Sequence, residues 1–322
     1  MQFSLDVLKI DPVKETERVA SFVTKEVKEV YRRSGIVLGL SGGIDSAVMA
    51  ALAVEALGRE RVIGLVLPEK ESNPVSSSFA VKHAEKLGIE CRVIDITQTV
   101  DSIGGYARRD DYIKTLIPEY EPGFKYNISL PPDLLERDAY NFYMLQVQMP
   151  DGLMAKKRLS LEAFRVITAF ANTKIRSRMI HQYYEADRRG CIVAGTTNRT
   201  EMILGDFCKY GDGGNDIEAL AELYKNQIYQ LGSHLGVIPE IMERIPSPDT
   251  FSLPVSDQEF FFRIPFEKLD HLLYAWEHSV PVEETARVLG VSEEAVKRAF
   301  RDFIAKNKAT AHLREIPHSP RK

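Results

Sequence analysis

The first hundred residues show short apolar runs separated by longer stretches in which apolar residues recur every three or four positions. The apolar runs predict three buried strands, at residues 36–40, 61–67 and 90–96. The longer stretches predict amphipathic helices, at residues 11–33, 44–57 and 76–87. Because strands that alternate with helices of this length require right-handed crossovers, the pattern predicts an α/β fold with a doubly wound parallel sheet.

The alternation returns later in the chain, with a helix predicted at 161–187, a strand at 191–195 and a helix that ends at 235. The tail over 266–308 has a helical pattern, with breaks at Pro281 and Gly290. We therefore expect one α/β domain, residues 1–264, and a helical C-terminal extension, residues 265–322, that packs on the same domain.

Between these two halves, over residues 97–160, the alternation stops. This stretch contains a glycine pair, five prolines and many aromatic residues: Tyr106, Tyr112, Tyr120, Phe124, Tyr126, Tyr140, Phe142 and Tyr143. The aromatic content argues against disorder. We expect an irregular insertion that serves as a lid or an interface.

Composition narrows the class of protein. The chain has 322 residues, 44% of them hydrophobic, and a formal net charge of −4, which disfavours non-specific binding to nucleic acid. No apolar run approaches the roughly 20 residues of a membrane helix, and the first residues lack a secretory pattern. The three cysteines, Cys91, Cys191 and Cys208, form no CxxC pair, so we expect neither disulfides nor a zinc site, and a cytoplasmic location.

The most informative motif lies where the first strand meets the next helix. A glycine-rich turn that leads into a helix N-terminus presents backbone N–H groups, and the helix dipole adds about half a positive charge. A carboxylate in that turn, Asp45, suits a magnesium ion beside bound phosphates. The motif therefore predicts a nucleotide-phosphate site formed by Gly39, Leu40, Ser41, Gly42, Gly43, Ile44, Asp45 and Ser46.

Other interpretations of this loop depend on its surroundings in the chain. Residues 39–43 also fit the G-x-S-x-G elbow of α/β-hydrolases, but that strand is normally preceded by several others, and only one helix fits before Ile36. A Walker A loop is excluded because no Gly-Lys-Ser/Thr follows the turn. An ordinary strand-to-helix turn, with glycines serving only its geometry, stays open on this stretch alone.

Several further segments occur in order after the loop: 172–179, 195–201, 209–216, 223–227, 246–249 and 310–314. Together with the loop they resemble the ammonia-dependent NAD synthetases, a family of N-type ATP pyrophosphatases in the PP-loop superfamily. The resemblance covers most of the chain outside residues 97–160. It implies an adenine nucleotide alpha hydrolase-like fold and a ligase that adenylates a carboxylate with ATP, releases pyrophosphate and then forms an amide with ammonia.

The resemblance also implies roles for individual residues. The loop over 39–46 would cradle the ATP phosphates, and Thr196, Lys225 and Ser247 would also contact ATP. Asp45 and Glu201 would hold magnesium, and Asp45 and Lys225 would act catalytically. The residues implied to bind deamido-NAD are Arg176, Lys209, Asp216 and His312. Family members are homodimers, so the resemblance implies a homodimer, with no membrane or nucleic-acid partner.

The basic middle of the helix predicted at 161–187 has a second interpretation. Lys174 and Arg176 lie there, and side chains of this kind often form nothing more than a solvated helix face. That interpretation stays open beside the role that the resemblance implies for Arg176.

Two departures from the family concern the acceptor acid. Leu313 replaces a lysine that the family uses on deamido-NAD, and the aromatic segment 251–262 replaces a more acidic one. An amide synthase of the same superfamily acting on another carboxylic acid therefore remains an alternative. The source of ammonia stays open.

A third hypothesis comes from residues 282–296, which resemble a helix-turn-helix around Gly290. In this hypothesis the protein is a DNA-binding regulator with a degenerate nucleotide domain. The second helix begins with Ser292, Glu293 and Glu294, which suit a helix N-terminus but repel phosphate. These acidic residues argue against DNA binding.

Overall fold

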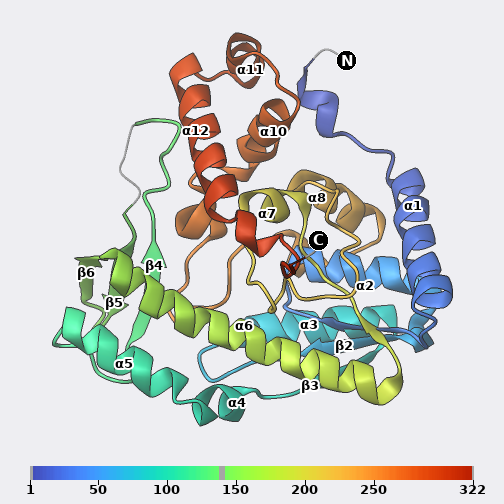
Figure 1. Cartoon of the computed structure of the whole chain (residues 1–322), viewed down its shortest axis with the longest axis horizontal. Helices are drawn as coiled ribbons and strands as arrows, with labels where there is room; N and C mark the ends of the chain where they lie inside the picture. The colour runs from blue at the N-terminus through green and yellow to red at the C-terminus, as the bar shows by residue number, and fades with distance from the viewer. Residues whose placement is uncertain (1–2, 138–141, 321–322) are drawn as a thin grey trace.

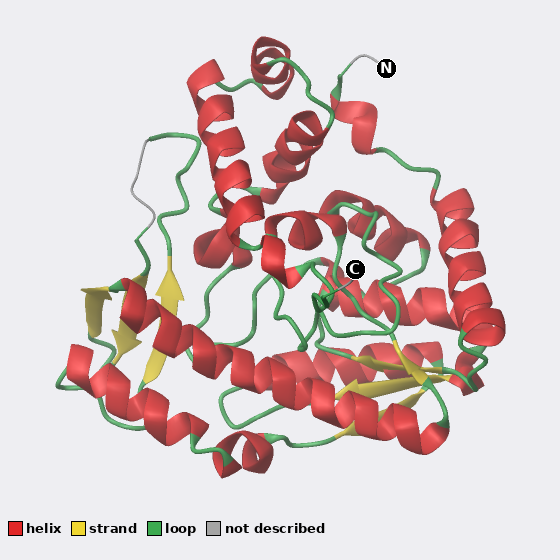
Figure 2. Ribbon diagram, viewed as in Figure 1, coloured by secondary structure: helices red, strands yellow, loops and turns green. Residues whose placement is uncertain are grey.

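The protein is built on a four-stranded parallel sheet in the order β3-β2-β1-β7, seen at the lower right of Figures 1 and 2. The structure is a computed structural model that describes residues 3–137 and 142–320. The sheet consists of β1 (Ile36–Gly39), β2 (Val62–Val66), β3 (Glu90–Val93) and β7 (Ile192–Val193). All pairings are parallel.

Helices cover both faces of this sheet. On one face α2 (Ile44–Leu57) and α3 (Pro74–Leu87) pack against β1 and β2, backed by α1 (Pro12–Lys25). The other face is covered by α6 (Leu161–Arg189), the long helix that crosses the front of Figure 1. Alternate residues of β1 pack into two hydrophobic cores, one on each face of the sheet. Ile36 and Leu38 lie on the α2 side and Val37 lies on the α6 side. The doubly wound sheet predicted from the sequence is confirmed.

The expectation of an irregular stretch over 97–160 is wrong. It forms α4 (Thr97–Ser102), α5 (Gly105–Leu116) and an antiparallel sheet of β4 (Lys125–Ser129), β5 (Met144–Gln148) and β6 (Met154–Arg158). Tyr126, Ile128, Leu145 and Val147 alternate with other residues along β4 and β5 and are buried with Ile167 of α6. Alternations this short are obscured in the sequence by the surrounding prolines and aromatics. Tyr140 lies outside the described residues.

The segment after residue 250 lies along β4. The Leu253 amide donates to the Tyr126 carbonyl (2.9 Å), and the Leu130 amide donates to the Glu259 carbonyl (2.7 Å). The segment continues into the π-turn η4 (Gln258–Phe262). The two parts of the chain that look unusual in the sequence, the aromatic stretch and residues 251–262, are therefore joined to each other.

The C-terminal region forms α10 (Phe266–Glu277), α11 (Val282–Leu289) and α12 (Glu293–Ala309), which share an apolar core and lie at the top of Figure 1. They pack on α7 (Arg199–Leu204) and α8 (Lys225–His234). The buried Asp270 of α10 accepts hydrogen bonds from the Thr200 hydroxyl (2.7 Å) and the Asn226 amide (2.6 Å). The C-terminal helices are thus anchored to the elements that carry Glu201 and Lys225.

Shorter elements complete the described chain: η1 (Leu5–Leu8), η2 (Glu26–Val30), η3 (Arg59–Arg61), α9 (Pro239–Met242) and η5 (Ala311–Leu313). Within residues 3–137 and 142–320, no helix has the length and apolar character needed to cross a membrane.

Candidate active site

The turn between β1 and α2 is held by its own serines. The Ser46 hydroxyl donates to the Gly43 carbonyl (3.0 Å) and accepts from the Ser41 amide (3.2 Å), and the Ser41 hydroxyl accepts from the Gly43 amide (3.2 Å). Gly43 is the N-cap of α2 and, as a glycine, has no side chain to occupy the first-turn N–H groups. The turn therefore forms a fixed anion site at the N-terminus of a 14-residue helix.

Gly42 has to be glycine. Its φ is +74°, and a Cβ there would lie 2.2 Å from the Ser76 carbonyl oxygen of α3. Arg244 fixes the same contact, because its guanidinium donates to the Gly42 carbonyl (3.2 Å) and to the Ser76 hydroxyl (2.8 Å). No local sequence pattern points to Arg244, which lies 202 residues from Gly42 along the chain.

Asp45, Lys225 and Glu201 meet beside this turn although they are far apart in the chain. The Lys225 ammonium lies 2.5 Å from Asp45 Oδ2 and 3.5 Å from Glu201 Oε1. Asn198 donates to Asp45 Oδ1 (2.8 Å) and forms a reciprocal capping box with Glu201 at the start of α7. Glu201 is thus both a helix cap and a member of the cluster.

Negative charge is in excess around Lys225. Burial raises the pKa of Asp206 to about 8, and the charges of Asp257 and Asp212 act in the same direction. Burial likewise raises the pKa of Asp257 to about 6. Burial and the charge of Asp45 hold the pKa of Glu201 well above its usual range. Burial acts to lower the pKa of Lys225, but Asp45 and Glu201 outweigh it and raise that pKa.

This excess of carboxylates suits a bound cation. In the described residues, no three His, Cys, Asp or Glu side chains converge as a complete metal site. Asp45 and Glu201, however, already share one positive charge on Lys225. Mg²⁺ in phosphate-binding sites takes one or two carboxylates and completes its shell with phosphate oxygens and water, so these two residues fit that ion.

A single cavity of about 1180 Å³ connects these groups, which is larger than the usual pocket for one small ligand. Among the described residues, its lining includes most of the predicted site: Gly39, Leu40, Ser41, Gly43, Ile44, Asp45, Ser46, Arg176, Thr196, Glu201, Lys209, Lys225, Ser247 and His312. Of the predicted residues, Gly42 and Asp216 fall outside that lining. The Asp216 carboxylate accepts from the Val193 amide (2.7 Å) and the Tyr183 hydroxyl (3.2 Å).

Two basic residues of the cavity lie next to each other, and one of them binds the C-terminal tail. Lys209 donates to the carbonyls of His312 (2.7 Å) and Glu315 (2.8 Å), which holds the tail against the loop after α7. Arg176 donates to the Lys209 carbonyl (3.2 Å). The cavity wall therefore has cationic groups beside the tail and a cluster of carboxylates around Lys225.

The unusual residues 251–262 and Leu313 also face this cavity. Its lining includes Phe251, Phe260, Phe261 and Leu313. Aromatic and aliphatic side chains thus form one part of its border, in contrast to the polar groups of residues 39–46. The departures seen in the sequence belong to the cavity wall.

The model of the NAD synthase family matches residues 15–116 and 142–317 of this chain. The match spans the loop, Asp45, Glu201, Lys225 and the C-terminal helices, and passes over the stretch that contains β4. The chain belongs to the NAD synthase family. The resemblance seen in the sequence is confirmed.

Curated relatives of this NAD synthase family chain match over nearly its full length. The NH(3)-dependent NAD(+) synthetase of Rhizobium meliloti is 41% identical over 311 residues, which is 97% of this chain and 92% of the relative. The enzyme of the same name from Thermotoga maritima is 34% identical over 86% of this chain and 95% of its own length.

Solved structures have the same fold. The NMN synthetase of Francisella tularensis superposes with a TM-score of 0.67 at 22% identity and covers 97% of this chain and 99% of its own. The NH3-dependent NAD synthetase of Campylobacter jejuni, in complex with a nitrate ion, gives 0.63 at 22% identity and covers 97% of this chain and 100% of its own. At this identity the likeness establishes the fold alone.

Proposed function

We propose that this NAD synthase family chain is a ligase that converts deamido-NAD and ammonia to NAD, with ATP cleaved to AMP and pyrophosphate. The observation that carries the proposal is the Lys225 ammonium, held between Asp45 and Glu201 beside the N-terminus of α2. The curated relatives named NH(3)-dependent NAD(+) synthetase support it.

In the first step a carboxylate oxygen of the acceptor attacks the α-phosphorus of ATP, and the bond to the β-phosphate oxygen breaks. The amides of residues 39–46 bind the phosphates, and Lys225 stabilises the negative charge that develops on the leaving pyrophosphate. Thr196 and Ser247, which line the same cavity, orient the nucleotide. Asp45 and Glu201 would hold Mg²⁺, which when bound neutralises phosphate charge.

In the second step ammonia attacks the acyl carbon, loses a proton, and AMP leaves with the bonding electrons. No protein nucleophile is needed, so the residues act by positioning and by charge stabilisation. We assign acceptor binding to Arg176, Lys209 and His312, which line the cavity, and not to Asp216, whose carboxylate is held outside the lining by Val193 and Tyr183. The basic groups of the cavity wall support this assignment for Arg176 and Lys209, because the phosphates of a dinucleotide are anionic.

We also propose a homodimer in the cytoplasm. Two residues one turn apart on α6, Ile180 and Tyr184, are 62% and 64% exposed, and Tyr210 is 58% exposed. Exposed apolar side chains grouped on a helix face support a subunit contact. The three free cysteines support a reducing compartment. Sedimentation of wild type and of Ile180→Glu tests the dimer, which should dissociate in the variant.

The test of the reaction is pyrophosphate release from ATP with deamido-NAD and ammonium, each omitted in turn. Release that requires both, together with NAD formation, supports the proposal. The apolar wall at Phe251, Phe260 and Leu313 favours one competitor, an amide synthase for another acid. Release that other carboxylic acids trigger and deamido-NAD does not would establish that competitor.

A further inference from the structure

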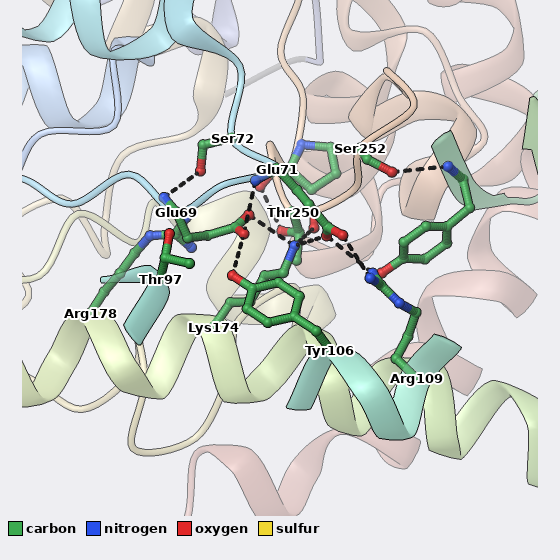
Figure 3. A network of polar contacts seen from close by, with 12 residues as sticks. Glu69, Glu71, Ser72, Thr97, Tyr106, Arg109, Lys174, Arg178, Thr250 and Ser252 are labelled. Atoms are coloured by element: carbon green, nitrogen blue, oxygen red, sulfur yellow. Dashed lines mark hydrogen bonds and ion pairs between the residues drawn. The ribbon is translucent and has the colours of Figure 1, made fainter. Parts of the chain in front are cut away.

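A second buried lysine lies directly behind the cavity wall. Lys174 of α6 is fully buried, whereas Ala171, Asn172, Ile175 and Arg178 on the same helix line the cavity. The interpretation of Lys174 as part of a solvated helix face is therefore wrong. Its side chain points into a network of polar groups (Figure 3).

The Lys174 ammonium joins two separate loops. It donates to Glu69 Oε1 (2.9 Å) and to Glu71 Oε2 (2.7 Å), both in the loop after β2. Its third hydrogen bond goes to the Thr250 carbonyl (3.1 Å), in the loop after α9. All three ammonium protons are therefore accounted for, and none is left for a ligand.

Each of these loops forms part of the cavity wall. Leu67, Pro68 and Ser72 line the cavity from the loop after β2, which follows the strand next to β1. The other loop contributes the run from Ser247 to Phe251, which includes the serine assigned to ATP. Lys174 thus links α6 and both loops at one point, behind the surface that they present to the nucleotide.

A second layer of contacts fixes the two carboxylates. Arg109 of α5 donates to both oxygens of Glu71 (3.0 and 2.6 Å). Tyr106 donates its hydroxyl to Glu69 Oε2 (2.6 Å), which also accepts the Glu71 amide (3.0 Å). Figure 3 shows Tyr106 and Arg109 reaching the loop from α5, so the stretch over 97–160 contributes to the same wall.

Stability alone is a weak explanation for such a cluster. Burying charges costs desolvation energy, and well-packed apolar residues in their place are often as stable. The ion cluster instead fixes the relative positions of its members, because an ammonium donates hydrogen bonds to three partners only in a defined geometry. A loop carbonyl and two carboxylates held this way cannot separate without leaving a buried charge unpaired.

We propose that Lys174 is a positioning residue for ATP, which sets the spacing between the loop after β2 and the Ser247–Phe251 loop. This inference rests on the proposed function, since it takes the nucleotide to lie between those loops. Lys174 touches no substrate. Loss of the Lys174 side chain displaces the two loops and so lowers the affinity for ATP. The arrangement of Lys225, Asp45 and Glu201, where the chemical step takes place, stays as it is.

The test variant is the double substitution Lys174→Met with Glu69→Gln. It removes one positive and one negative charge, and Arg109 remains to pair with Glu71. The amide oxygen of the introduced glutamine takes the place of Glu69 Oε2 and still accepts from Tyr106, while the link to Thr250 is lost. We expect KM for ATP and the calorimetric ATP dissociation constant to rise at least about tenfold, with kcat at saturating ATP within about threefold of wild type.

The matched control is Glu185→Gln. Glu185 lies on the same helix, is also buried, and pairs with Arg92 (2.5 Å) and Arg188 (2.6 Å) away from the cavity. We expect a lower melting temperature and an unchanged KM for ATP. A merely structural role for Lys174 predicts the same behaviour in the double variant, and that result would overturn the inference.

Three further outcomes are decisive. Should the double variant fail to fold, Glu71→Gln, which leaves Lys174 paired with Glu69, is expected to raise KM for ATP about threefold or more, and an unchanged KM there also counts against the inference. Wild-type protein that does not bind ATP overturns the proposed function together with the inference. Wild type that binds ATP, with variants of equal affinity, overturns the inference alone.

Discussion

Two buried lysines in this protein each lie between two carboxylates, yet they differ in what surrounds them. Lys225 pairs with Asp45 and Glu201 at 2.5 and 3.5 Å and lines the cavity. Lys174 pairs with Glu69 and Glu71 at 2.9 and 2.7 Å and lies behind the cavity wall. The first cluster has an open side, and the second is enclosed by protein groups.

The pKa values of Glu201 and Glu71, one carboxyl group from each cluster, are shifted in opposite directions. Around Lys225 the pKa values of Glu201 and Asp206 are raised, because burial and neighbouring negative charges are not balanced by the single ammonium. Burial also acts to raise the pKa of Glu71, but Arg109 and Lys174 outweigh it and lower that pKa. A lysine between two acids is therefore not by itself a catalytic sign. The unbalanced cluster is the one suited to a ligand.

The largest expected effect comes from Lys225→Met. Removing the cation that faces the leaving pyrophosphate should lower kcat about 1000-fold, or about 4 kcal/mol in the activation barrier. The melting temperature should fall less than in Lys174→Met, because Asp45 and Glu201 line the cavity. Steady-state rates and thermal unfolding of the same preparation measure both. If the variant kept more than a tenth of wild-type kcat, Lys225 would not have the proposed role.

Lys174→Met alone should show the opposite profile. It leaves Glu69 without a cation in an enclosed site, and breaking a buried pair in this way costs about 3 kcal/mol of unfolding free energy. Urea unfolding of this variant beside Lys225→Met makes the comparison. Equal losses of stability in the two variants would show that both clusters are equally solvated, contrary to the open side of one and the enclosure of the other.

The two clusters should also respond oppositely to pH. The Asp206 pKa is raised to about 8, so its contribution to stability is full below about pH 4 and is lost as pH rises through 8. Asp206→Asn, which mimics the protonated acid, should gain stability over wild type as pH rises from about 5 to 8, by about 4 kcal/mol at about 1.4 kcal/mol per pH unit.

For Glu71 the sign is reversed. Its lowered pKa means that stability is present above the usual value of 4.5 and is lost as pH falls. The deficit of Glu71→Gln relative to wild type should therefore stay constant from about pH 6 to 4.5 and shrink as pH falls further. Urea titrations across this range in magnesium-free buffer measure both variants. Parallel pH profiles for the two substitutions would contradict the assignment of unbalanced and balanced charge.

The smallest expected effect is stabilisation by magnesium. About 10 mM Mg²⁺ with a dissociation constant near 1 mM adds about 1.4 kcal/mol, a rise of a few degrees in melting temperature. Asp45→Asn should lose this shift and Glu71→Gln should retain it, because only the first belongs to the open cluster. An identical shift in wild type and in Asp45→Asn would place the ion elsewhere. Sodium chloride at matched ionic strength is the control.

The two clusters also differ in how far the sequence can reveal them. Asp45 lies in a local motif, and Glu201 and Lys225 follow in recognisable order, so the sequence predicts them as a set. Lys174 lies in segment 172–179, which carries part of the resemblance, but nothing local predicts its burial, because its partners Glu69 and Thr250 are 105 and 76 residues away. Its burial depends on contacts with α5 and with both loops, and no periodic pattern in the sequence predicts these contacts.

The strands also differ in how far the sequence can reveal them. Strands β1, β2 and β7 are buried almost throughout, and their continuous apolar runs mark them clearly. The strands β4 to β6 are five residues each, and their alternation is easily lost among prolines. Asp206 and Asp257 likewise escape prediction, because isolated acids in loops have no spacing that distinguishes them from surface charge.

The small antiparallel sheet has one edge covered and one edge open. Residues 252–259 lie along β4, whereas β6 forms the opposite edge and is largely exposed. An open edge offers unpaired amides and carbonyls to strands of other molecules, which is a common route to aggregation. β6 carries Lys156, Lys157 and Arg158 in succession, and two such edges would repel each other. The strand that the fold leaves open is thus the one whose positive charge disfavours edge-to-edge aggregation in a crowded solution.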